Sequence, residues 1–128
     1  MANLTRILVV DDEPMIRSML ERILGGDDRQ VTATSTGGEA LRAFELARVQ
    51  GAPFQVVVTD WGMPGMSGPE LAHCIKVAEH STLVVLLTGS ADDEAPVPYV
   101  DILLRKPGGL SALRSVLASP HSRTPSAT

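Results

Sequence analysis

Three hydrophobic runs of the chain lead into charged residues that could do chemistry together. The first run ends at Asp11 and Asp12, the second ends at Asp60, and the third is followed by Lys106. If the three runs are parallel neighbours in an open α/β sheet, their carboxyl ends share the edge where sites form. Carboxylates about 4 Å apart repel by roughly 4 kcal/mol per pair at an effective dielectric near 20. The cluster therefore needs a cation. Hard oxygen ligands suit Mg²⁺ or another divalent cation, and such a pocket with one lysine is suited to receiving a phosphoryl group.

The elements that must position these residues follow from the spacing of apolar residues. Short apolar or alternating runs predict strands over 7–10, 30–34, 56–59, 83–87 and 101–104. Helical spacing predicts helices after each of the first three strands and after the fifth, with Pro14 and Pro69 suited to first helical turns. This alternation predicts an α/β fold with a doubly wound, five-stranded parallel sheet.

The connection between the fourth and fifth strands departs from this alternation. It contains Pro96 and Pro98, which remove helical hydrogen bonds, and Ala95 is disfavoured from helix by the proline after it. Only residues 90–94 could be helical. We therefore expect the fourth helix to be shortened or absent.

Composition limits the classes of protein to consider. With 128 residues and 44% apolar content, the chain predicts one globular domain over residues 1–118, followed by a disordered tail over 119–128. A formal net charge of −4 argues against direct nucleic-acid binding. Cys74 is the single cysteine, which excludes an intrachain disulfide. The absence of a long apolar run and of a signal peptide predicts a cytoplasmic protein without a membrane partner.

Each charged residue also has an ordinary structural explanation when it is taken alone. Asp11 and Asp12 could cap a helix and complement its dipole. Asp60 could be a turn residue, and Lys106 could be a solvated lysine. Their joint placement at the ends of successive strands favours the chemical interpretation over these.

The pattern as a whole resembles the receiver domain of bacterial two-component response regulators, in particular stand-alone, chemotaxis-regulator-like receivers. The matching pieces, in chain order, are Asp11-Asp12, Asp60, the loop 63–68, Thr88 and Lys106-Pro107. The resemblance covers residues 6–117. It implies a flavodoxin-like strand order 2-1-3-4-5.

The resemblance implies a role for each acidic residue. Asp60 is expected to be the phosphoacceptor, a carboxylate nucleophile that takes a phosphoryl group from a histidine kinase or a phosphotransfer protein. Asp12 and Asp60 are expected to bind Mg²⁺ directly, together with the backbone carbonyl of Gly62. Asp11 is expected to hold the metal through water.

The resemblance also implies roles for the residues that handle the phosphoryl group. Lys106 is expected to pair with Asp60 and then with a phosphoryl oxygen, while Thr88 donates its hydroxyl to another. Asp60, Thr88 and Lys106 thus form the expected catalytic set. The bond before Pro107 is expected to be cis, which aims Lys106 back over the acidic pocket.

Two departures from the family bear on signal output. The switch position that works with Thr88 usually carries an aromatic residue or histidine, but here it is Leu103. The depleted fourth helix removes part of the usual output face. We therefore expect a weak or differently routed conformational change, and contacts with a downstream protein that the sequence does not identify. The oligomeric state is likewise not predicted.

Two other functions fit part of the pattern. A phosphotransferase or phosphatase with an aspartyl-phosphate intermediate, as in haloacid-dehalogenase-like enzymes, carries Asp-x-Asp after the first strand, whereas the nucleophile expected here follows the third. A flavodoxin-like cofactor binder needs a phosphate loop where Asp11 and Asp12 would repel a phosphate. We expect a signalling protein that catalyses only its own phosphorylation and dephosphorylation, without direct nucleic-acid contacts because no DNA-binding segment follows residue 118.

Overall fold

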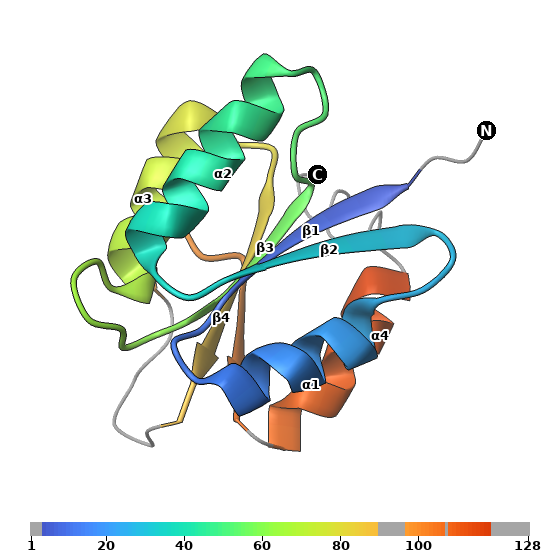
Figure 1. Cartoon of the computed structure of the whole chain (residues 1–128). Coiled ribbons are helices and arrows are strands. Elements are labelled where there is room, and N and C mark those ends of the chain that lie inside the picture. The colour runs from blue at the N-terminus through green and yellow to red at the C-terminus, as the bar shows by residue number, and fades with distance from the viewer. Residues whose placement is uncertain (1–3, 90–96, 107, 119–128) are drawn as a thin grey trace, which may run out of the picture.

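Every apolar run predicted as a strand is a strand in the computed structural model, which describes residues 4–89, 97–106 and 108–118 (Figure 1). The strands are β1 Thr5–Val10, β2 Arg29–Thr34, β3 Val56–Asp60, β4 Leu83–Thr88 and β5 Ile102–Arg105. The helices are α1 Pro14–Leu24, α2 Gly37–Val49, α3 Gly68–Ala78, the short 3₁₀ helix η1 Gly108–Ser111, and α4 Ala112–Ala118. The predicted alternation of strands and helices is thereby confirmed.

All neighbouring strands of the sheet run parallel, in the order β2-β1-β3-β4-β5. This is the predicted 2-1-3-4-5 arrangement of a doubly wound fold. The chain therefore changes direction across the sheet between β2 and β3, and the ends of β1 and β3 lie beside each other. Sites in such sheets form at this switch point.

Helices cover both faces of the sheet, with α1 and α4 on one side and α2 and α3 on the other (Figure 1). Alternate residues of β1 divide between the two cores: Ile7 and Val9 pack with α1 and α4, whereas Leu8 and Val10 pack with α2 and α3. β3 and β4 are buried along their whole length. Burial on both faces explains why these two strands are almost entirely apolar.

Local sequence signals account for the helix ends near the functional edge. α1 begins with Pro14 in its first turn, where a missing N–H costs nothing. The Thr36 hydroxyl accepts a hydrogen bond from the Glu39 amide at the start of α2. α3 begins with a capping box, in which Ser67 and Glu70 satisfy each other's free backbone N–H groups.

The boundaries differ from the sequence prediction at several strand and helix ends. β3 and β4 each run one residue further, so that Asp60 and Thr88 belong to their strands. β5 begins at Ile102 because the side chain of Asp101 accepts the hydrogen bond of the Val84 amide at 2.8 Å. The last helix is preceded by the 3₁₀ turn η1.

The connection from β4 to β5 lies against α3. Its described residues, Gly89 and 97–100, contain no helix. Tyr99 has a positive φ of 69° and its ring stacks on His73 of α3, with ring centroids 4.5 Å apart. The Lys76 ammonium contacts the Asp101 carboxylate at 2.8 Å. Residues 90–96, which include the segment expected to be helical at most over 90–94, lie outside the described residues.

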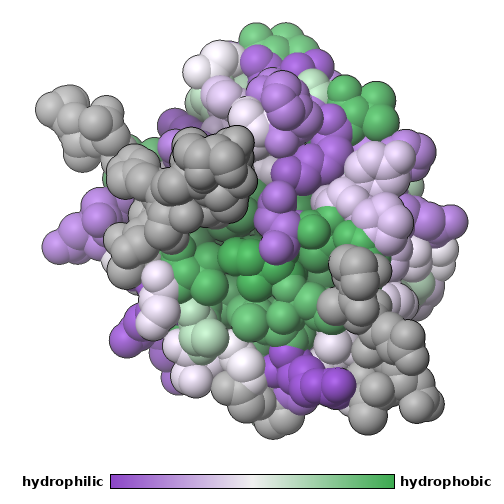
Figure 2. All heavy atoms as spheres, turned by 180° about the vertical axis from the view of Figure 1, so that it is seen from behind, coloured by the Kyte–Doolittle hydropathy of each residue, from purple (hydrophilic) through white to green (hydrophobic). Residues whose placement is uncertain are grey.

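β5 is an edge strand, and the side chains of residues 102–104 are only half-buried. Figure 2 shows the molecule from behind, where apolar side chains gather in one area of the surface. None of the helices in the described part of the chain is long and apolar enough to cross a membrane. The expected tail over 119–128 and the cis bond before Pro107 lie outside the described residues.

Candidate functional site

The register of the sheet brings the predicted site residues to one edge. Val10 of β1 pairs with Thr59 of β3. The next residues along the chain, Asp11 and Asp60, therefore lie at the same level of the sheet. Within the described ranges, the carboxylates of Asp11, Asp12 and Asp60 form a group whose oxygens lie within 4.8 Å of one another. The sequence predicted this group from strand ends alone.

Lys106 joins this group from the far side of β4. Its Nζ lies 3.0 Å from Asp60 Oδ1 and 3.5 Å from Asp11 Oδ2. Its backbone N–H donates to the carbonyl of Thr88 at 2.7 Å, which holds the turn after β5 against the end of β4. The predicted convergence of the lysine on the acidic pocket is therefore present in the structure.

Asp11 is the most enclosed of the three carboxylates, with no exposed surface. Burial raises the pKa of its carboxyl, and the negative charge of Asp60 acts in the same direction. A hydrogen bond from the Glu13 amide and the Lys106 ammonium lower the pKa, but burial outweighs them. Asp12, by contrast, is exposed at the mouth of the site.

Lys106 remains a cation at neutral pH. Burial lowers the pKa of its ammonium, but the hydrogen bond to Asp60 and the charges of Asp11 and Asp60 outweigh burial. Its pKa is therefore raised above the ordinary lysine value of 10.5. The site keeps one fixed positive charge throughout the physiological range.

The main chain around Asp60 fixes the position of its carboxylate. The Trp61 amide donates to Asp60 Oδ1 at 2.9 Å and also to the carbonyl of Leu87. α3 begins directly against this turn, because the Gly68 amide donates to the carbonyl of Trp61 at 2.7 Å. A Cβ atom on Gly68 would lie 2.2 Å from the carbonyl oxygen of Asp60. Only glycine permits this close approach between β3 and α3.

The remaining predicted positions lie close to this edge or outside the described residues. Thr88 is buried at the last position of β4, and it pairs with Arg105 of β5. Leu103 is half-buried in β5 and pairs with Leu86. Gly62 is exposed in the loop two residues after Asp60.

The donor set fits a divalent cation. Three carboxylates face a single ammonium, so the edge carries an excess of two negative charges. Carboxylate oxygens are the ligands that Mg²⁺ prefers, and one cation would remove the mutual repulsion of the three groups. A nearby positive charge would also offset the burial that raises the pKa of Asp11.

Two contacts at this edge were not predicted from the sequence. The Arg17 guanidinium donates from Nη1 to the carbonyl of Asp11 at 2.8 Å, and the carbonyl of Thr34 accepts the Asp11 amide at 3.1 Å. The sequence signal for the first is an arginine one turn into the helix that follows the acidic pair. That signal alone does not separate a contact with the main chain from a solvated arginine.

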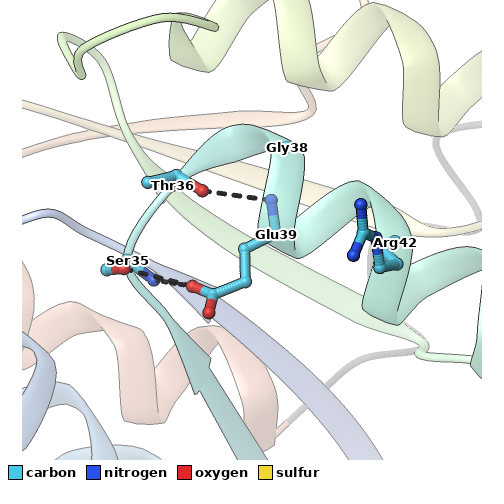
Figure 3. A pocket seen from close by; sticks show the side chains of 5 residues that line it. All are labelled: Ser35, Thr36, Gly38, Glu39 and Arg42. Carbon is cyan, nitrogen blue, oxygen red and sulfur yellow. Dashed lines mark hydrogen bonds between the residues drawn. The ribbon is translucent and has the colours of Figure 1, made fainter.

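A hollow of about 400 Å³ lies at the start of α2, lined by Ser35, Thr36, Gly38, Glu39 and Arg42 (Figure 3). None of its lining residues belongs to the acidic group. Its carboxylate is already engaged, since Glu39 accepts hydrogen bonds from the Ser35 amide and hydroxyl. The hollow is therefore separate from the acidic group, and its carboxylate is bound to neighbouring residues.

Comparisons with known proteins agree with this arrangement. The probable transcriptional regulatory protein SgaR of Hyphomicrobium methylovorum is 30% identical over 95 residues, which cover 73% of this chain and 43% of that protein. A crystal structure of a receiver domain protein from Clostridium thermocellum has a TM-score of 0.80 at 28% identity, covering 98% of this chain and all of the other.

The response regulator TrrA of Thermotoga maritima has been solved with Mg²⁺ and BeF, and in complex with the histidine kinase ThkA. The first structure has a TM-score of 0.75 at 28% identity, covering 91% of this chain and 98% of the other. The second has a TM-score of 0.74 at 29% identity, covering 91% and 97%.

The chain spans about half, or less, of the length of the curated relatives it matches. Residues 7–118 match the response regulator receiver domain. This match includes the carboxyl ends of all five strands and all of the described helices. The chain therefore belongs to the receiver domain family of two-component response regulators.

Proposed function

We propose that this receiver accepts a phosphoryl group on Asp60 and passes a signal on through protein–protein contacts. The observation that carries the proposal is the position of the Asp60 carboxylate, 3.0 Å from Lys106 Nζ and within 4.8 Å of the Asp11 and Asp12 carboxylates. A carboxylate placed beside a fixed ammonium and a cation site is positioned for attack on a phosphorus atom.

The chemical step transfers one phosphoryl group. An oxygen of Asp60 forms a bond to phosphorus while the bond from phosphorus to the donor's nitrogen or oxygen breaks, and the donor leaves with that electron pair. Such transfers need mainly positioning and neutralisation of the equatorial oxygens. Lys106 supplies one positive charge, and the Thr88 hydroxyl is the proposed donor to another oxygen.

The same residues would hold the metal. Asp12 and Asp60, with the carbonyl of Gly62, are the proposed direct ligands, and Asp11 is the proposed partner of a metal-bound water. Mg²⁺, when bound, supplies further neutralisation of the phosphoryl oxygens. Asp12 is exposed to solvent, whereas Asp11 is buried and lies 3.5 Å from the half-buried Lys106 ammonium.

We propose a histidine kinase or a phosphotransfer protein as the phosphoryl donor. The complex of TrrA with a histidine kinase supports this choice for a chain of the same fold. The downstream protein is not assigned, because several curated relatives are transcriptional regulators and this chain spans only part of their length.

Acetyl phosphate with Mg²⁺ tests the proposal without any partner. Phos-tag electrophoresis of the treated chain is expected to show one shifted band, and Asp60→Asn is expected to abolish the band because an amide is not the nucleophile. Asp27→Asn, the same change at an exposed position of the α1–β2 turn, is the matched control and should phosphorylate normally.

A shifted band that persists in Asp60→Asn would place the acceptor elsewhere. Continuous release of phosphate from many different phosphate esters, in place of one phosphoryl group per chain, would support a phosphatase with an aspartyl-phosphate intermediate.

A further inference from the structure

Arg17 makes a contact that the receiver chemistry described above does not use. It lies on α1 and is half-buried, and its Nη1 donates to the backbone carbonyl of Asp11 at 2.8 Å. Long side chains on a helix lean toward the helix N-terminus. An arginine at this position therefore reaches back over the first turn of α1 to the main chain that precedes the helix.

Besides the Lys106 contact to its carboxylate, the Asp11 turn is held at three further points by three different parts of the chain. The Asp11 amide donates to the carbonyl of Thr34 in β2 at 3.1 Å. The Glu13 amide donates to Asp11 Oδ1 at 2.9 Å. Arg17 supplies the third point at the carbonyl, and it is the only one of the three that comes from a charged side chain.

The Arg17 contact acts on the main chain and not on a carboxylate. The charges that shift the pKa of the Asp11 carboxyl are those of Asp60 and Lys106. Removal of Arg17 also takes away a positive charge close to the site, which by itself would strengthen cation binding, so weaker binding would report the lost main-chain contact. The loss of this contact would free the peptide between Asp11 and Asp12, whose orientation decides where both carboxylates point.

The charge of Arg17 also acts on a second acidic side chain, Glu39. Glu39 of α2 has a lowered pKa, first because it accepts hydrogen bonds from the Ser35 amide and hydroxyl, and to a smaller extent because of the Arg17 charge. Figure 3 shows the Glu39 carboxylate turned toward Ser35. The contact that fixes the guanidinium is therefore the Asp11 carbonyl, since the Glu39 carboxylate is already engaged by Ser35.

We propose that Arg17 is a positioning residue for divalent-cation binding, which fixes the Asp11 carbonyl so that the Asp11 and Asp12 carboxylates face Asp60. The inference rests on the metal site of the proposed function. Partners that orient metal ligands are typically worth 10–100-fold in metal affinity. Because Arg17 contacts the main chain of Asp11 and no ligand atom directly, the lower part of this range is expected.

Arg17→Met tests the proposal, with Mg²⁺ alone as the probe and Trp61 fluorescence and calorimetry as readouts. We expect about 10-fold weaker Mg²⁺ binding. Arg17→Lys, which keeps a single charged donor, should recover part of the affinity. Arg22→Met is the matched control, since it makes the same change at an exposed position of the same helix, and it should bind Mg²⁺ like the unmodified chain.

Amide hydrogen exchange in the metal-free protein provides a readout that does not depend on the loaded site. In Arg17→Met the Glu13 amide should exchange faster, while core amides of β3 keep their protection. A role confined to overall stability would instead speed exchange throughout the chain and leave Mg²⁺ affinity unchanged once the protein is folded.

Equal Mg²⁺ affinity in folded Arg17→Met and Arg22→Met would overturn the proposal, and so would unchanged affinity in Arg17→Lys if the methionine variant does not fold. This outcome is separate from a failure of the proposed function. A chain that binds Mg²⁺ in an Arg17-dependent way but takes no phosphoryl group would leave the positioning role intact and remove the phosphoacceptor role.

Discussion

The acidic edge of the sheet and the connection from β4 to β5 are held by different kinds of contact. At the acidic edge, buried charges and main-chain hydrogen bonds fix each group from several sides, as for Asp11 and Asp60. The described residues of the connection contact α3 through an exposed ring stack and an ion pair, and join β4 through the hydrogen bonds between Asp101 and Val84. The charged groups of the site are therefore fixed at the ends of the strands, whereas the described part of the connection is fixed largely by side chains of α3.

Among single substitutions that separate these two regions, removal of the Lys106 ammonium should change the free energy of unfolding most. Loss of one partner from a buried ion pair typically costs about 3–5 kcal/mol. Because the Lys106 side chain keeps 15% of its exposure, we expect Lys106→Met to lower the free energy of unfolding by about 2 kcal/mol in metal-free buffer at pH 7.

Urea unfolding with and without Mg²⁺ measures this effect. The loss should shrink when Mg²⁺ is added, because the cation replaces the missing positive charge and its binding stabilises the folded state by mass action. Equal stability of the variant and the unmodified chain in metal-free buffer would mean that Lys106 does not compensate the carboxylates.

The raised pKa of Asp11 predicts a smaller effect that depends on pH. A carboxyl with a pKa raised on folding binds its proton more tightly in the folded state. Its contribution to stability is therefore present below the unfolded value of 3.8 and is lost as the pH rises through the raised folded value. Asp11→Asn, which cannot ionise, should gain stability relative to the unmodified chain over this window in metal-free buffer.

The measurement is the difference in unfolding free energy between the two proteins from pH 3.5 upward, at about half-unit steps. Lys106 does not contribute to the slope, since its raised pKa lies above this window. Asp27→Asn serves as the exposed control. A difference that stays flat, or that falls with pH, would contradict the dominance of burial at Asp11.

The smallest effect is expected at Tyr99. Tyr99→Gly loses the stack on His73, which is worth about 0.5–1.5 kcal/mol. Glycine also adopts the positive φ of 69° at this position without the cost of about 1 kcal/mol that a non-glycine residue has there. The two terms nearly cancel, so stability should stay within about 0.5 kcal/mol of the unmodified chain.

The Tyr99 variant also tests whether the two regions are independent. Its Mg²⁺ affinity and its phosphorylation by acetyl phosphate should match those of the unmodified chain. A clear loss of either would show that the connection from β4 to β5 supports the acidic edge, and that the two regions are not independent.

The strand ends could be predicted from the sequence because they depend on local patterns. Apolar runs place Asp11, Asp60 and Lys106 at successive carboxyl ends, and parallel pairing then brings them together. The same local rules predict a shortened or absent fourth helix, which stays a prediction because residues 90–96 lie outside the described part of the chain.

Contacts between distant parts of the chain could not be predicted in the same way. The Arg17 bond to the Asp11 carbonyl depends on the direction of a long side chain. The Asp101 carboxylate accepts the hydrogen bond of the Val84 amide and also contacts Lys76 of α3, a residue distant in the sequence. The Tyr99 stack needs a backbone conformation that tyrosine rarely adopts, so no sequence pattern indicates it.

Site mapping tests most directly whether Asp60 takes the phosphoryl group. The chain is treated with acetyl phosphate and Mg²⁺, reduced with borohydride to convert an acyl phosphate to an alcohol, and digested for mass spectrometry. We expect that Asp60 alone is converted to homoserine, and that omission of Mg²⁺ suppresses the conversion. Conversion at Asp11 or Asp12, or an unmodified Asp60 in a chain that binds Mg²⁺, would contradict the role of Asp60 as the phosphoacceptor.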